Sequence, residues 1–190
     1  MISHVLTARS LKSGLFAAAL SVLSLTTFVG TSAAAGTQSA QAQGEAIAIF
    51  AGGCFWCVES DYDYVPGVTK TISGYTGGIL QNPTYGQVTA GGSGHIEAVQ
   101  IHYDPKKTSY EKLLDVFWRS VDPTDAGGQF CDRGASYATA IFANSPEQKK
   151  IAEASRAKVT KSGALERPIV TPVRLAGKFY PAEGYHQDYY

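Results

Sequence analysis

Two cysteines separated by two bulky aromatic residues are the first feature of this sequence that could do chemistry. The stretch AGGCFWCVES over 51–60 places Cys54 and Cys57 at CxxC spacing. The alternating pattern over 45–51 predicts a strand that ends in a Gly-Gly turn, and residues 54–64 have the apolar spacing of a helix. Cys54 therefore opens a helix, where free backbone N–H groups and the helix dipole are expected to lower its thiol pKa. Cys57 follows one turn later on the same face, within reach of a disulfide to Cys54.

Three chemical interpretations of the CxxC pair are compatible with the sequence. The pair could form half of a zinc site completed by Cys131 and His95. It could also be a permanent disulfide, although so short a loop would stabilise the fold little. The third interpretation is a reactive Cys54 thiol with Cys57 as its resolving partner. The chain has three cysteines, and this odd number argues against a purely structural set of disulfides.

The first forty-two residues differ in composition from the rest of the chain. Residues 1–42 contain no acidic residue, and an apolar run over 15–29 is followed by small residues. This pattern predicts a signal peptide with cleavage after Ala35 or Ala42, and an uncleaved anchor is the alternative. We therefore expect an exported bacterial protein, periplasmic or secreted, with a single catalytic domain over 43–190.

Charge excludes one class of partner for the mature chain. Removal of Arg9 and Lys12 leaves 14 basic against 16 acidic residues, which is a net charge of −2. No basic stripe remains, so we expect no nucleic-acid partner. We also expect no stable membrane insertion after cleavage, because the apolar run leaves with the signal peptide.

The remaining pattern predicts an α+β fold. Two helices are expected after the capping sequences at 108–111 and 145–148. Further strands are expected at 68–75, 97–103, 137–142 and 169–175. This order predicts a two-layer sandwich, with helices against one face of a mainly antiparallel mixed sheet and a ferredoxin-like split β-α-β core.

Several short motifs occur in a fixed order along the chain. They are GCFWCVE, GYTGG (74–78), NPTY (82–85), GHIEAV (94–99), FWRSVDPTD (117–125), DRGASYATAI (132–141) and YHQDY (185–189). In these motifs the sequence resembles the peptide methionine sulfoxide reductase A family, from about Ile47 to the C-terminus. The resemblance implies a thiol-dependent reductase of the S epimer of methionine sulfoxide, free or in proteins. It also implies no bound cofactor or metal, and an external thiol reductant such as a thioredoxin-like protein or dithiothreitol.

The resemblance assigns the nucleophile and its neighbours. Cys54 matches the nucleophile, which becomes a sulfenic acid and then part of an intramolecular disulfide. Phe55 and Trp56 match the residues that hold the S-methyl group of the substrate. Burial of either ring in the core is the alternative for each.

Three further residues match the part of the family site that surrounds the sulfoxide oxygen, and a fourth matches another active-site acid. These are Tyr85, Glu97 and Tyr137, with Asp132 as a further acid. Attack of a thiolate on sulfur requires that the departing oxygen be protonated or strongly hydrogen-bonded. A buried Glu97 with a raised pKa could supply that proton, whereas a solvated residue at a strand start is the alternative.

The sequence departs from the common family pattern at two cysteines. Cys57 stands where Gly is frequent, Cys131 stands where Asn is frequent, and the C-terminal tail contains no cysteine. Cys57 is therefore the predicted resolving thiol, while a second exchange to Cys131, or direct resolution by it, stays open. His186 matches a family histidine without an assigned role, and His95 could orient Glu97 or only begin a strand.

Two other functions are compatible with a CxxC pair alone. One is a general periplasmic thiol-disulfide oxidoreductase, although such motifs favour small residues, proline or histidine between the cysteines. The other is a secreted binding module stapled by one disulfide. A thiol titration would separate them, because a staple leaves no reactive thiol.

Overall fold

The fold is known from a computed structural model that describes residues 44–190. The predicted signal peptide over 1–42 lies outside the described residues. The elements include two 3₁₀ turns at Ala135–Tyr137 and Gly184–His186. The strands are β1 (Ala46–Gly52), β2 (Val68–Thr76), β3 (Ile96–Tyr103), β4 (Gly128–Gln129), β5 (Asp132–Arg133), β6 (Thr139–Ala143), β7 (Val173–Leu175) and β8 (Tyr180–Pro181). The helices are α1 (Phe55–Asp63), α2 (Tyr85–Thr89), α3 (Tyr110–Ser120) and α4 (Pro146–Lys161).

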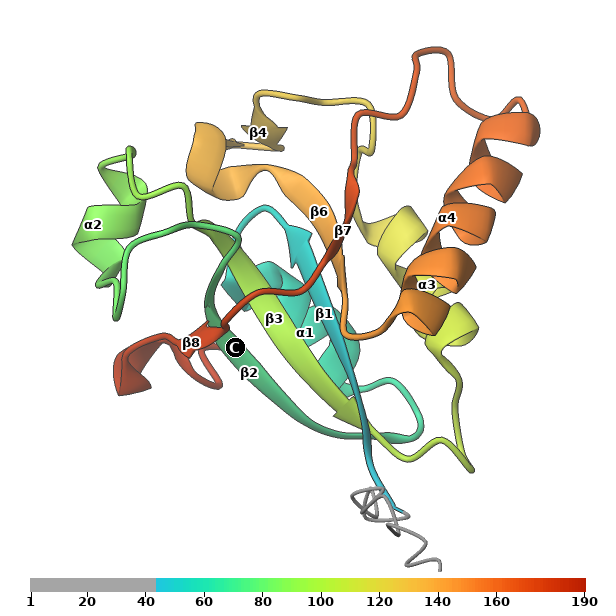
Figure 1. Cartoon of the computed structure of the whole chain (residues 1–190), viewed down its shortest axis with the longest axis horizontal. Coiled ribbons are helices and arrows are strands. Elements are labelled where there is room, and N and C mark those ends of the chain that lie inside the picture. The colour runs from blue at the N-terminus through green and yellow to red at the C-terminus, as the bar shows by residue number, and fades with distance from the viewer. Residues whose placement is uncertain (1–43) are drawn as a thin grey trace, which may run out of the picture. The chain divides into compact units, whose positions relative to one another are not determined.

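A six-stranded sheet in the order β7-β6-β1-β3-β2-β8 forms the centre of the described chain (Figure 1). β3 pairs antiparallel with both β1 and β2, so β1 and β2 run parallel with β3 between them, joined by α1. This is the split β-α-β unit that the sequence predicts. Only the pairing of β6 with β7 is parallel among the described ladders, which confirms the prediction of a mainly antiparallel mixed sheet.

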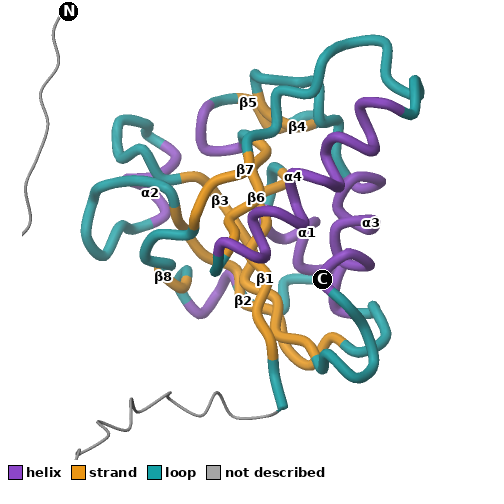
Figure 2. Tube along the Cα trace, turned by 45° about the vertical axis from the view of Figure 1, so that its right-hand side comes forward, coloured by secondary structure: helices purple, strands orange, loops and turns teal. Residues whose placement is uncertain are grey.

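The two faces of the sheet have different covers. α1 and α3 pack on one face, and the principal core lies between them and the strands, with Phe50, Leu114 and Phe117 fully buried in it. A smaller cluster around Phe142 lies on the opposite face, where Ala176 and Phe179 from the segment after β7 cover it. Figure 2 shows α1, α3 and α4 gathered on one side of the strands, with α2 and its loops at the other edge.

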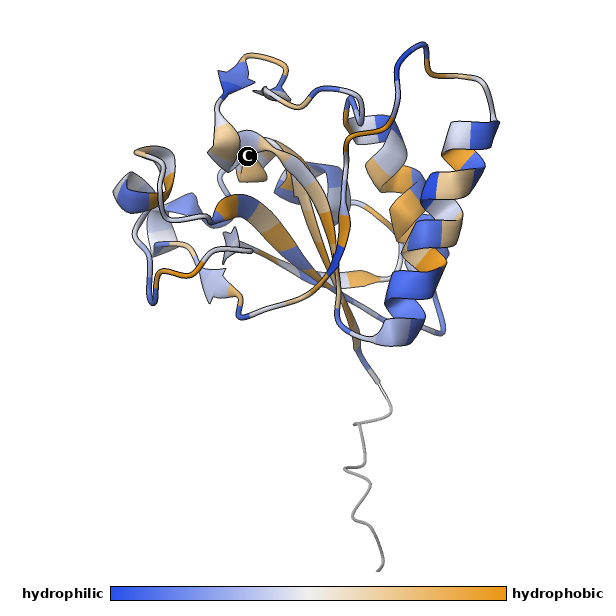
Figure 3. Ribbon diagram, turned by 45° about the horizontal axis from the view of Figure 1, so that its top comes forward, coloured by the Kyte–Doolittle hydropathy of each residue, from blue (hydrophilic) through white to orange (hydrophobic). Residues whose placement is uncertain are grey.

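Local sequence signals explain where the long helices begin. Ser145 caps α4 by accepting a hydrogen bond from the Gln148 N–H, and Pro146 occupies the first turn, as predicted. The cap of α3 is Ser109, one residue later than the predicted capping box begins. Figure 3 shows hydrophilic and hydrophobic positions interspersed along α4. This helix packs beside α3, where the Trp118 indole N–H donates a hydrogen bond to Ser155 at 2.9 Å.

Three parts of the chain differ from the predicted elements. Tyr137 ends a 3₁₀ turn, so β6 begins later than the predicted strand at 137–142. β7 begins only after Pro172, because proline lacks the N–H that a ladder needs. The sequence gives no prediction of the short helix α2, the β4–β5 hairpin or β8.

Within residues 44–190, no helix has both the length and the apolar character needed to cross a membrane.

Candidate active site

Cys54 lies in the tight turn between β1 and α1. It is the N-cap of α1, whose first helical residue is Phe55, so the helix begins one residue after the predicted start. Gly53 has φ of +92°, and a Cβ at this position would lie 2.6 Å from the Cβ of Gln129. The turn therefore requires glycine, both for its backbone conformation and for the close packing of the β4–β5 hairpin against it.

The environment of the Cys54 thiol corrects the expectation of a lowered pKa. The pKa of Cys54 is raised to about 11, chiefly by burial and in smaller part by the charges of Cys57 and Glu97. The backbone N–H groups of Trp56 and Cys57 do hydrogen-bond to the sulfur and lower its pKa, as the helix start predicts. Their effect is smaller than that of burial, because the half-buried sulfur has lost much of its hydration.

Glu97 on β3 is the buried acid of the site. Its side chain is 1% exposed, and its Oε2 accepts a hydrogen bond from the Phe55 N–H at 3.0 Å. Its other oxygen, Oε1, is buried without a hydrogen-bond partner. Burial raises the pKa of Glu97 to about 7, the hydrogen bond from Phe55 lowers it, and the negative charge of Asp132 raises it. The solvated alternative for Glu97 is therefore wrong, and the carboxyl can exchange protons near neutral pH.

Tyr85, Tyr137 and Asp132 come from three separate elements and face the same carboxyl. The pKa values of both tyrosines are raised, chiefly by burial, and each also senses the negative charges of Glu97 and Asp132. The two phenol groups hydrogen-bond to each other. Tyr85 begins α2, Tyr137 ends a 3₁₀ turn and Asp132 begins β5. The structure thus brings together Glu97 and the two tyrosines that the resemblance places around an oxygen, with Asp132 beside them.

Aromatic rings enclose the side of Cys54 that faces the C-terminal segment. Phe55 is 1% exposed and belongs to the principal core, while Trp56 is only partly buried. The Phe55 ring lies 5.0 Å from His186 and 6.2 Å from Tyr85 between centroids. Tyr189 stacks on Trp56 with centroids 3.8 Å apart and an interplanar angle of 6°. Phe55 is therefore buried in the core, as the alternative interpretation of this ring expected, and it also forms one wall of the aromatic enclosure.

Two residues of the C-terminal segment belong to the site although sequence reasoning gave them no role. His186 is 2% exposed, and neither ring nitrogen has a hydrogen-bond partner, so burial lowers its pKa. Glu183 accepts hydrogen bonds from the Tyr75 hydroxyl at 2.8 Å and from the Tyr85 N–H at 2.9 Å. Glu183 thereby fixes the start of α2 against β2. The YHQDY motif could have indicated that His186 belongs to the site, whereas no local sequence pattern distinguishes Glu183.

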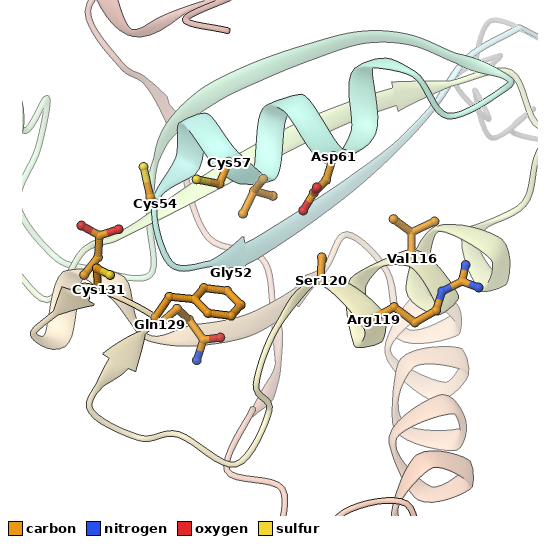
Figure 4. A pocket seen from close by; sticks show the side chains of 12 residues that line it. Gly52, Cys54, Cys57, Asp61, Val116, Arg119, Ser120, Gln129 and Cys131 are labelled. Atoms are coloured by element: carbon orange, nitrogen blue, oxygen red, sulfur yellow. The ribbon is translucent and has the colours of Figure 1, made fainter.

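The other two cysteines lie at an open cavity that Cys54 also lines. Cys57 and Cys131 are both exposed, and all three cysteines are free thiols. They line one end of a cavity of about 670 Å³ between α1, the end of α3 and the β4–β5 hairpin, whereas Asp61, Val116 and Arg119 line its far end (Figure 4). Exposure and position make Cys57 and Cys131 accessible to exchange with an external thiol.

Two of the earlier interpretations lose support from this geometry. His95 uses both ring nitrogens for the backbone, since Nδ1 accepts from the Gly78 N–H and Nε2 lies 2.8 Å from the Leu80 carbonyl. It therefore neither orients Glu97 nor offers a free nitrogen to zinc. Among residues 44–190, no cluster of three or more His, Cys, Asp or Glu side chains could hold a metal ion.

Comparison with known families decides the relationship of the chain. The sequence matches the family described as peptide methionine sulfoxide reductase over residues 46–190. The chain belongs to this family, whose members are oxidoreductases. It is 55% identical to the peptide methionine sulfoxide reductase MsrA of Bacillus licheniformis over 144 residues, which cover 76% of this chain and 80% of the relative. It is 56% identical to MsrA of Listeria monocytogenes serotype 4b over 143 residues, covering 75% and 81%.

Solved reductases have the same fold. Methionine sulfoxide reductase A of Corynebacterium diphtheriae has a TM-score of 0.68 and 32% identity, covering 77% of this chain and 74% of that one. Reduced Mxr1 of Saccharomyces cerevisiae has a TM-score of 0.72 and 28% identity, covering 77% and 84%. Mxr1 has also been solved in complex with Trx2; at 20% identity and a TM-score of 0.56, this chain shares the fold of that structure.

Proposed function

We propose that this peptide methionine sulfoxide reductase family member reduces the S epimer of methionine sulfoxide, free and in proteins, with Cys54 as nucleophile. The observation that carries the proposal is the hydrogen bond from the Phe55 N–H to Glu97, which fixes a buried acid beside the residue that follows the half-buried thiol. A stapled binding module needs no such acid, and disulfide exchange requires no proton on an oxygen. A reaction that moves a proton onto an oxygen needs such an acid.

The pKa values of the thiol and the acid define the direction of proton transfer. With the pKa of Cys54 about 11 and that of Glu97 about 7, the pair above pH 7 holds one proton, which resides on the thiol. Glu97 takes this proton as the thiolate forms and passes it to the sulfoxide oxygen. The thiolate attacks the sulfoxide sulfur and the oxygen is transferred to Cys54, which yields a sulfenic acid and the thioether of methionine.

The residues around Glu97 divide the remaining work. The Tyr85 and Tyr137 hydroxyls donate hydrogen bonds to the sulfoxide oxygen as negative charge grows on it. Burial is the main reason for the raised pKa of Glu97, and the negative charge of Asp132 adds to it. Phe55 and Trp56 contact the S-methyl group and exclude water from the reacting sulfur, so that the thiolate competes with no solvent.

Cys57 resolves the sulfenic acid. Its thiol lies one helical turn from Cys54 and is exposed, so it can condense with the sulfenic acid to a 54–57 disulfide with loss of water. A thioredoxin-like protein, or dithiothreitol in the test tube, then returns both cysteines to thiols. Cys131, exposed at the same cavity, provides a second exchange partner.

The site of action follows from the leader. The acid-free, apolar segment over 1–42 supports export, and we place the mature enzyme in the periplasm or outside the cell, where it repairs oxidised exported proteins. Cell fractionation together with N-terminal sequencing tests this placement. A full-length chain retained in the cytoplasm would contradict it.

Turnover of separated R and S epimers tests the activity. With dithiothreitol as reductant, the S epimer of a blocked methionine sulfoxide should be reduced and the R epimer should not. Equal turnover of both epimers would contradict the epimer assignment. Disulfide reduction in a protein such as insulin without any sulfoxide turnover would favour the general thiol-disulfide oxidoreductase instead.

A further inference from the structure

The cavity beside Cys57 and Cys131 is built differently from the enclosure that receives the sulfoxide. The aromatic residues Phe55, Trp56 and His186 do not line it. Its lining combines apolar groups from Val58, Val116 and Phe130 with two acids, Asp61 and Asp132, and one base, Arg119. Cys54 and Asp132 belong to both regions: both line the cavity, while Cys54 precedes Phe55 and the charge of Asp132 acts on Glu97.

The residue at the tip of the β4–β5 hairpin is unusual in both conformation and exposure. Gln129 pairs with Asp132, so Phe130 and Cys131 form a two-residue connection. Phe130 has φ of +50°, a conformation that favours glycine or asparagine, and its ring is 74% exposed. A bulky aromatic in a strained and solvated position contributes little to folding. Such an outlier indicates a use for the side chain outside the fold.

The hairpin presents Phe130 from a rigid base. The Gln129 side chain is 1% exposed and accepts a hydrogen bond from the Asp122 N–H at 2.8 Å. It also donates to the Asp122 and Gly128 carbonyl oxygens. Its Cβ packs against Gly53, next to the catalytic thiol. The position of Phe130 relative to Cys54 is therefore fixed, so little ordering is needed when a partner binds.

We infer that this cavity is the docking surface for a protein dithiol reductant, with Phe130 as its apolar anchor. The inference rests on the proposed function, which leaves a disulfide at Cys57 after each turnover. An attacking thiolate must reach an exposed sulfur, and the exposed sulfurs Cys57 and Cys131 both lie in this lining. Encounters between redox proteins are small interfaces, and one aromatic anchor beside a reactive sulfur suits that size.

The exchange on this surface balances in atoms and electrons. One thiolate of the reductant attacks the Cys57 sulfur of the 54–57 disulfide, which forms a mixed disulfide and releases Cys54 as a thiolate that takes up a proton. The second thiol of the reductant then attacks the first reductant sulfur and releases Cys57. The reductant ends as a disulfide, and two electrons and two protons have passed to Cys54 and Cys57.

Steady-state kinetics with two reductants tests the docking surface. Phe130→Asn suits the positive φ and removes the ring, and Ile79→Asn is the control, because Ile79 is 93% exposed and does not line the cavity. We expect Phe130→Asn to raise KM for a bacterial thioredoxin about tenfold, as loss of an interface anchor does. Turnover with dithiothreitol should stay within about twofold, because a small thiol needs no platform. Ile79→Asn should change neither value.

Each other outcome has a definite meaning. An unchanged KM for thioredoxin with normal dithiothreitol turnover would overturn the docking surface and leave the proposed function intact. A raised KM for a sulfoxide peptide under dithiothreitol would assign the cavity to the substrate chain instead. No turnover with dithiothreitol in the unaltered protein would remove the proposed function itself.

A trapping experiment provides a second readout that does not depend on Phe130 alone. A thioredoxin whose second active-site cysteine is replaced by serine should accumulate as a mixed disulfide with the oxidised enzyme. Mass mapping should place that bond on Cys57, and charge reversal by Arg119→Glu at the far end of the cavity should lower the yield. A bond on Cys54, or a yield insensitive to Arg119→Glu, would contradict docking in this cavity.

Discussion

The two regions next to Cys54 differ in their exposure to solvent. On one side, Phe55, Glu97 and His186 are each at most 2% exposed, and polar atoms of Glu97 and His186 have no partner in the protein. On the other side, Cys57 and Cys131 are exposed around an open cavity. Chemistry on a sulfoxide needs a dry and fixed environment, whereas thiol exchange needs access. In the proposed mechanism the Cys54 sulfur takes part in both reactions, because it belongs to both regions.

Replacement of Cys54 should abolish both sulfoxide reduction and the thiol exchange that follows it. In Cys54→Ser, the hydroxyl is a poor nucleophile at neutral pH, so methionine formation should fall by at least about a thousandfold. Quenched single-turnover assays measure this, with circular dichroism to verify the fold. Single-turnover activity above background in Cys54→Ser would refute the assignment.

Replacement of Glu97 should slow only the reduction of the sulfoxide, which takes place in the buried region. Glu97→Gln still offers a hydrogen bond but cannot transfer a proton, so the chemical step should slow about a hundredfold. Reduction of a preformed 54–57 disulfide by thioredoxin should be unchanged, which makes that reaction the internal control. If pre-steady-state formation of methionine keeps its rate, Glu97 has a different role.

Replacement of Cys57 should impair only the recycling of the enzyme by an external thiol, which takes place in the exposed region. Cys57→Ser should keep a stoichiometric burst of one methionine per enzyme, while recycling by a thioredoxin-like reductant should fall at least about tenfold. The matched variant Cys131→Ser should lose less, and mass mapping of the oxidised wild type should find the 54–57 bond. A 54–131 bond as the first kinetic product, with Cys57 free, would make Cys131 the resolving thiol.

The pH dependence of the burst sharpens the proton assignment. Glu97 must start as a carboxylate to accept the Cys54 proton, so the rate of methionine formation should rise with pH up to about 7 and then level off. The slope should approach about tenfold per pH unit on the acidic side. Glu97→Gln should lose this inflection. A rate that instead declines as pH rises through 7 would mean that Glu97 enters the reaction protonated.

The smallest expected effect is on stability. The pKa of Glu97 is raised above its ordinary 4.5 to about 7 by folding, so the folded state binds more protons than the unfolded state between these values. The free energy of unfolding should therefore decrease as pH rises through this window. Glu97→Gln should be more stable than the wild type at pH 8, on the order of 2 kcal/mol in urea denaturation. Equal stability at pH 8 would show that the carboxylate is solvated.

Local patterns predicted some parts of the molecule well and others poorly. The turn before Cys54, the caps at Ser145 and the alternating strands rest on interactions between near neighbours in sequence, and the structure confirms them. The predicted direction of the Cys54 pKa shift was wrong, because this shift depends on burial by segments far along the chain. The role of Glu183 was not predicted for the same reason, whereas the β4–β5 hairpin was not predicted because each of its strands has only two residues. Glu183 acts on Tyr75 and Tyr85 about a hundred residues away, as the hydrogen bonds show.

In the proposed mechanism, the placement of Cys57 one turn from Cys54 also limits oxidative damage to the enzyme itself. A sulfenic acid that waits in the presence of peroxide advances to sulfinic acid, which thiols do not reduce. A thiol held on the same short helix encounters the sulfenic acid far more often than a dilute oxidant does, because their effective concentration is set by the covalent tether. The disulfide is thus a safe resting form, and the enzyme can remain oxidised without loss until a reductant arrives.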